Sequence, residues 1–388
     1  MSKRLRIALI AACPFPCPRG TPIRIQRMAE ALAKFGHDVH VITYHLGDKS
    51  GNHPFRIHRI PDIPFYQNTK PGPTFLKLFL LDLLLAIKFI RLHAKIKFDI
   101  IHSHHYEGLI ATLPSQLFFS TPILYDAHTL LLTELHHYNI PLPRHILDRI
   151  AATLDRTLPK FADHIISVSK SIEETLKILD DNQDELISVV PNGVEIDLFP
   201  QKDTKKNMGD DLVLGYAGNF APYQRLDVLL KAFLHIHKSY PTTTLKIYTE
   251  DDPADVLALI GEVSLGAIIR VFKTPFDDLP DKLAKTDILL NPRMDGAGHP
   301  LKLLNYMAAG KPIVTFPGSA HGLTHNDTAW IVGENSVNSF AEGIVALIQD
   351  RETRVRIGRN ARRHVEKNHI WAVNASILTD IYLGLLSK

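Results

Sequence analysis

The chain has 388 residues, of which 45% are hydrophobic, 44 are basic and 41 are acidic. This length exceeds that of a usual single domain and the hydrophobic content allows a large core, so the composition excludes a disordered chain and predicts two domains. The formal net charge of +3 is too nearly balanced to indicate a nucleic-acid partner. The only two cysteines, Cys13 and Cys17, share one loop, which favours reduced thiols in a cytoplasmic protein over a disulfide framework.

Short apolar runs alternate with helical periodicity along the first half of the chain, which is typical of a parallel α/β sheet. Strands are predicted at RIALIAA from Arg6, DVHVITY from Asp38, DIIHSHH from Asp99, PILYDAH from Pro122 and HIISVS from His164, with a helix over IRIQRMAEALAKF from Ile23. The loop before that helix carries Gly20 and Thr21 but no GxGxxG pattern, which disfavours a dinucleotide-binding oxidoreductase.

The strongest membrane candidate is the apolar segment FLKLFLLDLLLAIKFIRLHAKIK from Phe75. Three charged residues, the last of them Lys88, interrupt it too early for a membrane-spanning helix. Two interpretations stay open: a packing helix of the α/β domain, and an interfacial helix whose basic flank runs to Lys97. The second, together with the proline- and aromatic-containing loop 60–74, suits a lipid-linked acceptor and peripheral association with the inner face of a membrane.

The regular pattern breaks between Val189 and Asp211, where turn-forming and charged residues predominate, and restarts after it. The later apolar runs are LVLGYAGNF from Leu212, LDVLLKAFLHIH from Leu226, TLKIYTE from Thr244, AIIRVF from Ala267, DILLNP from Asp287 and PIVTF from Pro312. We therefore predict two facing, doubly wound parallel-sheet domains, residues 1–195 and 196–371, with the ligand in the cleft between them. A C-terminal helix at about 372–388 is expected to pack back on the first domain.

The segment from Asp287 to Phe316 has the order strand, glycine-bearing loop, helix, strand. Gly298 lets the backbone approach a bulky anion, and Pro300 suits the first turn of a helix. The free N–H groups of that turn and the charge of Lys302 predict a site for a nucleoside diphosphate. Gly310 is expected to end the helix.

Taken in order, these motifs resemble a family 4 glycosyltransferase with the GT-B fold, which has two Rossmann-like domains. The resemblance is carried by PRGTPIRIQRMAEALAKFGHDVHVIT, DIIHSHH, YDAH, ADHIISVSKSI, VVPNGVEIDLF, GYAGNFAPYQRLDVLLKAF and the diphosphate segment, spread over nearly the whole chain. It implies a retaining transferase that moves a sugar from a UDP- or GDP-linked donor, bound mainly by the second domain, to a hydroxyl of a glycan or lipid-linked acceptor. It also implies no cofactor and no obligatory metal.

The resemblance places the donor sugar beside His128, which ends a predicted strand and so is expected to face the ligand. The family's usual basic pair, which binds the diphosphate, is missing, because Asn219 and Gln224 fall at or near its positions. Arg225 is the alternative for the second of these, since a guanidinium can hold phosphate oxygens bidentately. Lys302 would add a further cation where leaving-group charge develops.

The family's two glutamates in the diphosphate segment fall on Ala297 and Asn305, and the asparagine can still hydrogen-bond a ribose hydroxyl. The full set of expected donor-binding residues is Gly20, Thr21, Gly218, Asn219, Phe272, Gly298, His299, Pro300, Leu301 and Asn305. His102 and His104 share one face of a strand, with His105 beside them. A zinc site there is conceivable, but no carboxylate or cysteine lies nearby in sequence, so a structural role is favoured.

Two other functions stay open. A non-catalytic nucleotide-sugar or glycan-binding subunit would explain the residues that depart from the family pattern, Asn219, Ala297 and Asn305. A GT-B-like enzyme with another reaction, such as a sugar-nucleotide epimerase, would turn over a nucleotide sugar in the absence of an acceptor.

Overall fold

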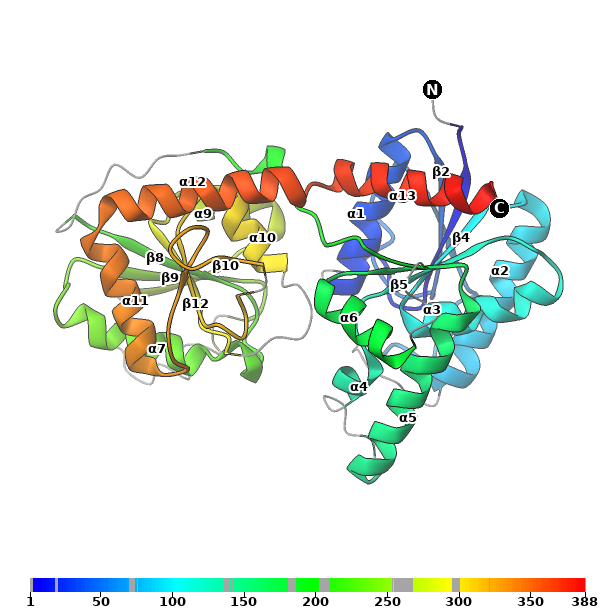
Figure 1. Ribbon diagram of the computed structural model, residues 1–388, viewed down its shortest axis with the longest axis horizontal. Coiled ribbons are helices and arrows are strands. Elements are labelled where there is room, and N and C mark those ends of the chain that lie inside the picture. The colour runs from blue at the N-terminus through cyan, green and yellow to red at the C-terminus, as the bar shows by residue number, and fades with distance from the viewer. Residues whose placement is uncertain are drawn as a thin grey trace. The chain divides into compact units, whose positions relative to one another are not determined.

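The computed structural model describes residues 3–17, 20–69, 74, 76–135, 140, 142–180, 186–201, 210–252, 254, 268–294, 301–320 and 322–387. The chain forms two compact units. Unit 1 comprises Met1–Gly193 and Trp371–Lys388, and unit 2 comprises Val194–Ile370. In each unit, helices cover a parallel β-sheet (Figure 1).

Unit 1 contains a seven-stranded sheet in the order β3-β2-β1-β4-β5-β6-β7. The strands are β1 (Arg6–Ala11), β2 (Asp38–Thr43), β3 (Arg56–Arg59), β4 (Ile100–His104), β5 (Ile123–Ala127), β6 (His164–Ser167) and β7 (Ile187–Val189). The helices are α1 (Gly20–Lys34), η1 (Lys77–Leu81), α2 (Asp82–Ile96), α3 (His105–Thr112), η2 (Leu113–Leu117), α4 (Leu131–Glu134), α5 (Arg144–Thr157), η4 (Leu158–Phe161) and α6 (Lys170–Leu179). Every strand pairing is parallel.

Strands β4 and β5 are buried at every position. Helices lie on both faces of the sheet, which explains why these strands have apolar runs rather than a strict polar and apolar alternation. The exceptions are polar and lie toward the carboxyl ends, at His102, Ser103, His104 and Asp126, all with at most 1% of their surface exposed. Buried polar side chains must find partners, so these residues point to the part of unit 1 where chemistry is to be sought.

The C-terminal helix α13 (Trp371–Leu386) belongs to unit 1, although unit 2 precedes it in the chain. Its buried face, which includes Leu378 and Tyr382, packs in one core cluster with Ile25 and Met28 of α1. The Tyr382 hydroxyl lies 2.6 Å from Nδ1 of His102 on β4. This helix therefore completes one apolar layer of unit 1 and reaches the polar residues of the sheet.

Unit 2 contains a six-stranded sheet in the order β10-β9-β8-β11-β12-β13. The strands are β8 (Val213–Ala217), β9 (Thr244–Thr249), β10 (Ile269–Lys273), β11 (Ile288–Asn291), β12 (Ile313–Thr315) and β13 (Trp330–Ile331), again all parallel. The helices are η6 (Ile196–Leu198), η7 (Pro222–Gln224), α7 (Leu226–His237), η9 (Phe276–Asp278), α9 (Leu279–Ala284), α10 (Leu301–Ala308), α11 (Val337–Gln349) and α12 (Arg351–Asn368).

The predicted strand, helix and strand of the diphosphate segment are confirmed as β11, α10 and β12, and the two strands pair in parallel. Gly310 has φ +66°, the left-handed conformation that commonly follows a helix end, as the sequence predicts. The expected loop residues Gly298, His299 and Pro300, as well as Ala297, lie outside the described residues.

The sequence analysis missed three short strands, β3, β7 and β13, which have four, three and two residues. Such short runs carry too little periodicity to be recognised before their partner strand is known. Within the apolar segment considered as a membrane candidate, Lys77–Leu81 form a π-helical stretch, η1, that continues directly into α2. No helix among the described residues is long and apolar enough to span a membrane.

Candidate active site

Each sheet reverses its winding direction beside its first strand. In unit 1, β1 lies between β2 and β4, and in unit 2, β8 lies between β9 and β11. Ligands of open parallel sheets bind outside the carboxyl ends of the strands at such a point. The residues that follow β1, β4 and β5 in unit 1, and β8 and β11 in unit 2, are therefore the candidates for binding and chemistry.

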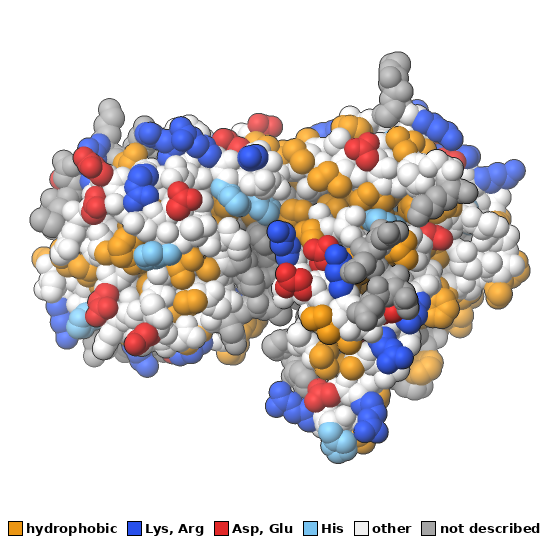
Figure 2. All heavy atoms as spheres, viewed as in Figure 1, with side chains coloured by type: hydrophobic (Ala, Val, Ile, Leu, Met, Phe, Trp, Pro, Cys, Tyr) orange, Lys and Arg blue, Asp and Glu red, His pale blue; other side chains and the backbone are white. Residues whose placement is uncertain are grey.

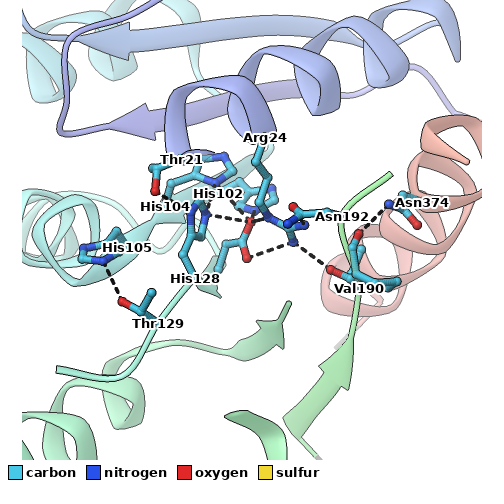
Figure 3. A network of polar contacts seen from close by, with 12 residues as sticks. Thr21, Arg24, His102, His104, His105, His128, Thr129, Val190, Asn192 and Asn374 are labelled. Atoms are coloured by element: carbon cyan, nitrogen blue, oxygen red, sulfur yellow. Dashed lines mark hydrogen bonds and ion pairs between the residues drawn. The ribbon is translucent and has the colours of Figure 1, made fainter. Parts of the chain in front are cut away.

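A buried ion pair lies at the carboxyl edge of the unit 1 sheet (Figure 3). Arg24 on α1 donates from Nε to Oδ2 of Asp126 at 2.9 Å and from Nη2 to Oδ1 at 3.1 Å. The same guanidinium donates to Oδ1 of Asn192 at 3.0 Å and to the carbonyl of Val190 at 2.8 Å. Burial alone would raise the pKa of Asp126, but Arg24 and neighbouring imidazoles hold it well below its usual value. The pair therefore stays ionised and joins α1, β5 and the chain after β7.

Two histidines contact the same carboxylate. Oδ2 of Asp126 lies 3.2 Å from Nδ1 of His104 and 3.2 Å from Nε2 of His128. The other nitrogen of His128, Nδ1, lies 3.2 Å from the Thr21 hydroxyl. Burial lowers the pKa of His128 and lowers that of His104 to about 4, so both rings are neutral at pH 7. Both nitrogens of the neutral His128 ring contact side chains of unit 1, so a ligand hydroxyl would bind the ring by sharing or replacing the Thr21 contact.

The ligand atoms of His102, His104 and Asp126 lie within 4.8 Å of one another, a spacing that a metal ion could span. The sequence analysis did not identify Asp126 as a partner of these histidines, because it comes from the next strand, where it pairs in register with His104. Arg24, however, engages both oxygens of that carboxylate. A fixed guanidinium repels a divalent cation and occupies the oxygens that would bind it, so these residues do not fit a metal site.

Alternating acidic and basic side chains contact one another around His105, the first residue of α3. Nε2 of His105 lies 2.9 Å from Oε2 of Glu134, and Nδ1 lies 3.2 Å from Oε2 of Glu107, whose Oε1 is 2.5 Å from Nζ of Lys77. Burial would lower the pKa of His105, but the two carboxylates raise it to about 10. His105 also has φ +63°, and strained backbone of this kind is concentrated at functional sites. The sequence analysis missed both glutamates, although the position of Glu107, two residues after the predicted strand DIIHSHH, was an available signal.

Two tyrosines shape the loop after β8 in unit 2. The Tyr216 hydroxyl donates to the carbonyl of Asn219 at 2.8 Å. Gly218 has φ +152°, and a Cβ there would lie 2.9 Å from that hydroxyl, so the position requires glycine. The Tyr306 hydroxyl on α10 accepts a hydrogen bond from the amide of Ala217 at 2.6 Å. The carboxyl end of β8 is thus fixed against the helix that carries Lys302.

Lys302 lies in the first turn of α10, where its ammonium contacts an amide oxygen and an aromatic ring. Its Nζ donates to Oε1 of Gln224 at 2.5 Å and lies 4.9 Å from the ring centroid of Tyr216. No carboxylate of the described residues is within ion-pairing distance of it. Burial, together with the charge of Arg293, lowers the pKa of Lys302 to about 7. An ammonium in this position gains strongly from a bound anion, which would restore its charge.

Two arginines lie next to this lysine. Arg293, which follows β11, has its guanidinium carbon 5.1 Å from the ring centroid of Tyr223. Arg225, at the start of α7, donates from Nη1 to Sδ of Met294 at 3.0 Å, while its Nε and Nη2 donate to the carboxylate of Asp227 at 2.9 and 3.0 Å. Lys302 on α10, Arg293 after β11 and Arg225 at the start of α7 therefore lie around the η7 turn, and Asp227 pairs with Arg225.

The sequence analysis selected Lys302 and Arg225 but not Arg293. Its position, two residues after a buried strand, was the available signal, because the loop that follows such a strand faces the ligand. Of the other expected residues in unit 2, Leu301 opens α10, Asn305 lies one turn further along the same helix, and Asn219 is exposed in the loop after β8.

Phe272 lies further from this group, since its strand, β10, is separated from β8 by β9. Its ring stacks on Tyr248 with centroids 5.8 Å apart. In unit 1, Gly20 begins α1, and the next residue, Thr21, contacts His128 as described above. The residues expected in the first domain thus lie together at one edge of the unit 1 sheet.

Comparisons with known proteins agree with this division of the chain. A family model described as Glycosyltransferase Family 4 matches residues 18–198, and one described as Glycosyl transferases group 1 matches residues 211–350. The chain is 24% identical to the D-inositol 3-phosphate glycosyltransferase of Corynebacterium glutamicum (strain R), over 74% of this chain and 72% of that protein. The protein of the same name from Corynebacterium diphtheriae is 23% identical, over 97% of this chain and 94% of that protein.

Solved structures with the GT-B fold are similar over almost the whole chain. Sucrose-phosphate synthase from Thermosynechococcus elongatus has a TM-score of 0.79 at 19% identity, covering 99% of this chain and 100% of that one. Anabaena HepE in complex with UDP and glucose has a TM-score of 0.73 at 16% identity, covering 98% and 100%. WaaG, a glycosyltransferase involved in lipopolysaccharide biosynthesis, has a TM-score of 0.71 at 16% identity, covering 97% and 100%. The likeness establishes the GT-B fold of two Rossmann-like domains.

The buried ion pair predicts a large effect of Asp126→Asn on stability. The substitution leaves the Arg24 guanidinium buried without a charged partner, so we expect a loss of about 3–5 kcal/mol in the free energy of unfolding at pH 7. Because the folded-state pKa of Asp126 is depressed, its contribution is present above the unfolded-state pKa and is lost as the pH falls below it. Chemical denaturation followed by Trp371 fluorescence, in a Trp330→Phe background, would measure both effects for unit 1.

Glu173→Gln is the matched control, because Glu173 forms a more exposed pair with Lys177 one turn away on α6, at 3.3 Å. Its expected cost is below about 0.5 kcal/mol. Equal effects of the two substitutions would contradict a stabilising role for the buried pair.

Proposed function

Because this chain belongs to the family 4 glycosyltransferases, we propose that it transfers a sugar from a nucleoside diphosphate donor to a hydroxyl of a glycan or lipid-linked acceptor, with retention of configuration and without an obligatory metal. The observation that carries the donor assignment is the group of three cations in unit 2, Lys302, Arg293 and Arg225. A uridine diphosphate donor is favoured, since the structurally similar HepE was solved with UDP and with UDP-glucose.

The diphosphate is proposed to bind between the loops that follow β8 and β11. Lys302 and Arg293 supply two positive charges, and the N-terminal turn of α10 supplies free N–H groups. A bound diphosphate would raise the pKa of Lys302 and so recover the charge that burial suppresses in the free protein. These features favour a phosphate anion over an uncharged ligand at this edge of the sheet.

This arrangement also offers a reason why the family's usual basic pair is dispensable here. Gln224 falls near the position of the second basic residue, and its amide oxygen accepts a hydrogen bond from the Lys302 ammonium at 2.5 Å. We infer that the cation that binds the diphosphate is supplied in this protein by the first turn of α10 rather than by the loop after β8, and that Gln224 orients it. Arg293 would take over the charge that is missing at Asn219.

In the proposed reaction, the bond between the anomeric carbon and the diphosphate oxygen breaks, and the electron pair leaves with the diphosphate. Lys302 and Arg293 stabilise the charge that develops there. The acceptor oxygen bonds to the anomeric carbon on the same face, and its proton passes to the departing phosphate oxygen. His128 is proposed to orient the sugar through a hydrogen bond, in keeping with its neutral ring.

An exposed apolar stripe favours an acceptor at a lipid surface. Its residues lie three or four positions apart along η1 and α2, and they are Leu76, Phe79, Leu83 and Ile87. Exposed basic residues follow at Arg91 and Lys95 on the last turns of α2. Apolar side chains next to cations are typical of helices that lie in the interface of an anionic membrane. We therefore propose peripheral membrane association through this helix.

The donor assignment predicts that Lys302→Gln and Arg293→Gln each reduce nucleoside diphosphate release by about 100-fold or more in kcat/KM, because each removes a charge that stabilises the leaving group. The assay screens UDP-, GDP-, ADP- and dTDP-sugars with glycan and lipid-linked acceptors. Lys231→Gln, on the exposed face of α7, is the control and should leave the rate unchanged. Donor binding without release under any acceptor would favour a binding subunit, and turnover without an acceptor would favour an epimerase.

The lowered pKa of Lys302 predicts proton uptake on binding of a nucleoside diphosphate. At pH 8 the free ammonium, with a pKa of about 7, is mostly deprotonated, and the bound anion would restore its proton. Affinity should therefore fall as the pH rises above 7. Calorimetry at pH 8 in two buffers of different ionisation enthalpy would measure the uptake.

Lys302→Arg is the control for this measurement, since a guanidinium stays charged throughout this range. The nucleotide's own ionisation is common to both proteins and cancels in the comparison. Equal proton uptake by the two proteins would contradict the role of Lys302.

Membrane association predicts co-sedimentation with anionic vesicles at low salt. Leu83→Asp or Ile87→Asp should weaken binding by about tenfold, because each replaces apolar area that would enter the interface. Ile178→Asp is the control, since Ile178 on α6 is 81% exposed but lies outside the stripe. Vesicle binding that is equally weakened by all three substitutions, or absent at low salt, would rule out this surface.

A further inference from the structure

Unit 2 contains a second cationic pocket, at the opposite edge of its sheet from Lys302. We propose that this pocket binds a small phosphorylated molecule, such as a sugar phosphate or a nucleotide, separately from the sugar donor. The inference rests on the position, charge and size of the pocket and does not depend on the proposed reaction.

The pocket lies at the amino ends of β11 and β12. One wall is formed by Asp287, which directly precedes β11, and by the segment 309–312 between α10 and β12. The other wall is the middle of α12. Helix α10 starts beside the donor candidates and ends at this pocket, so the two sites lie at opposite ends of the same helix. A ligand here would therefore not occupy the donor position.

Cationic side chains dominate the lining. There are five of them, Lys311, Arg354, Arg359, Arg362 and Arg363. Two carboxylates, Asp287 and Glu366, accompany them. Glu366 accepts from Nε of Arg362 at 2.6 Å, and Asp287 accepts from the amide of Val213 at 2.8 Å, so both carboxylates have partners within the fold.

Two of the arginines have structural roles. Nη1 of Arg354 donates to the carbonyls of Leu347 and Ile348 at 2.6 and 2.7 Å, which fixes the end of α11. Arg362 donates to the carbonyl of Phe199 at 2.9 Å and to that of Ala308, the last residue of α10. These contacts account for the two side chains without any ligand.

Arg359 and Arg363 have no such role. They lie one turn apart on α12, both are exposed, and neither makes a hydrogen bond or ion pair with the described residues. The space-filling view shows Lys and Arg side chains gathered over α12 (Figure 2). Two guanidinium groups at this spacing can each offer paired N–H donors to one phosphate group. They form the charged wall of the pocket that a phosphate would contact first.

The size of the pocket favours a ligand larger than a bare ion. Its volume is about 320 Å³, which is in the range of small-molecule sites. Ala309, Pro312 and Val355 line part of it and offer an apolar surface for the body of a sugar or a nucleoside. A molecule with one or two phosphate groups and a small organic part fits both the charge and the volume.

The test is calorimetric titration of the full-length protein with pyrophosphate and with a hexose 6-phosphate. The pocket variant is Arg359→Gln with Arg363→Gln, which removes two charges from exposed positions that no described residue contacts by a polar bond. The control is Arg351→Gln with Lys367→Gln, which removes two charges from the same helix outside the pocket lining. The donor cations are unchanged in all three proteins.

We expect the pocket variant to weaken binding of at least one probe by tenfold or more, and the control variant to leave it within twofold. Equal weakening in both variants would show that only the general charge of α12 matters, and this would overturn the proposal. Titrations that do not differ between wild type and pocket variant, together with equal vesicle binding by these two proteins, would overturn it as well.

A phosphate group can also come from a lipid headgroup, so flotation with phosphatidylglycerol vesicles forms a second arm. A tenfold loss of affinity for a soluble probe in the pocket variant, with unchanged vesicle binding, would identify a soluble metabolite as the ligand. Loss of vesicle binding in the pocket variant but not in the control, without binding of either soluble probe, would identify the lipid as the source of the phosphate.

Discussion

The buried pair between Arg24 and Asp126 is the constraint on which the rest of unit 1 depends. A guanidinium with 1% of its surface exposed must have all its donors satisfied, and its partners come from β5 and from the chain after β7. The pair therefore fixes α1 at the edge of the sheet. It also sets the chemistry around it, because the ionised carboxylate holds His104 and His128 in place while burial keeps their rings neutral.

The described charges of unit 2 are arranged differently from those of unit 1. In unit 1 each cation of the buried network has an internal anion, whereas Lys302 lies against an amide oxygen and a tyrosine ring. Burial, together with the charge of Arg293, lowers the pKa of this ammonium, and no carboxylate of the described residues pairs with it. An anion bound beside Lys302 would raise this pKa again, which is the basis of the donor site proposed above. The two sheets share the reversal of winding direction beside their first strand, but their described charges are arranged differently.

Several parts of the site could be predicted from the sequence, and others could not, for identifiable reasons. His128 directly follows a strand, and Lys302 lies in the first turn of a helix. Such positions are visible in the local sequence pattern. The contact of Asp126 with His104 was invisible, because it depends on the register between two strands. Arg293 was passed over although it follows a strand, and only the fold shows that Tyr223 and Lys302 lie beside it.

By itself, the sequence determined the alternation of strands and helices, the class of the fold and the segment that forms the diphosphate candidate, because these follow from local periodicity and from residues that start and end helices. Only the tertiary structure decided which charges meet. Glu134 reaches His105 across 29 positions, and Arg24 reaches Asp126 across 102, so no local pattern records either pair. The pocket beside Arg359 and Arg363 arises in the same way, since its walls come from segments that meet only when α12 packs against the start of β12. Electrostatic interactions act through space, and the order of residues along the chain leaves those distances undefined until the chain has folded.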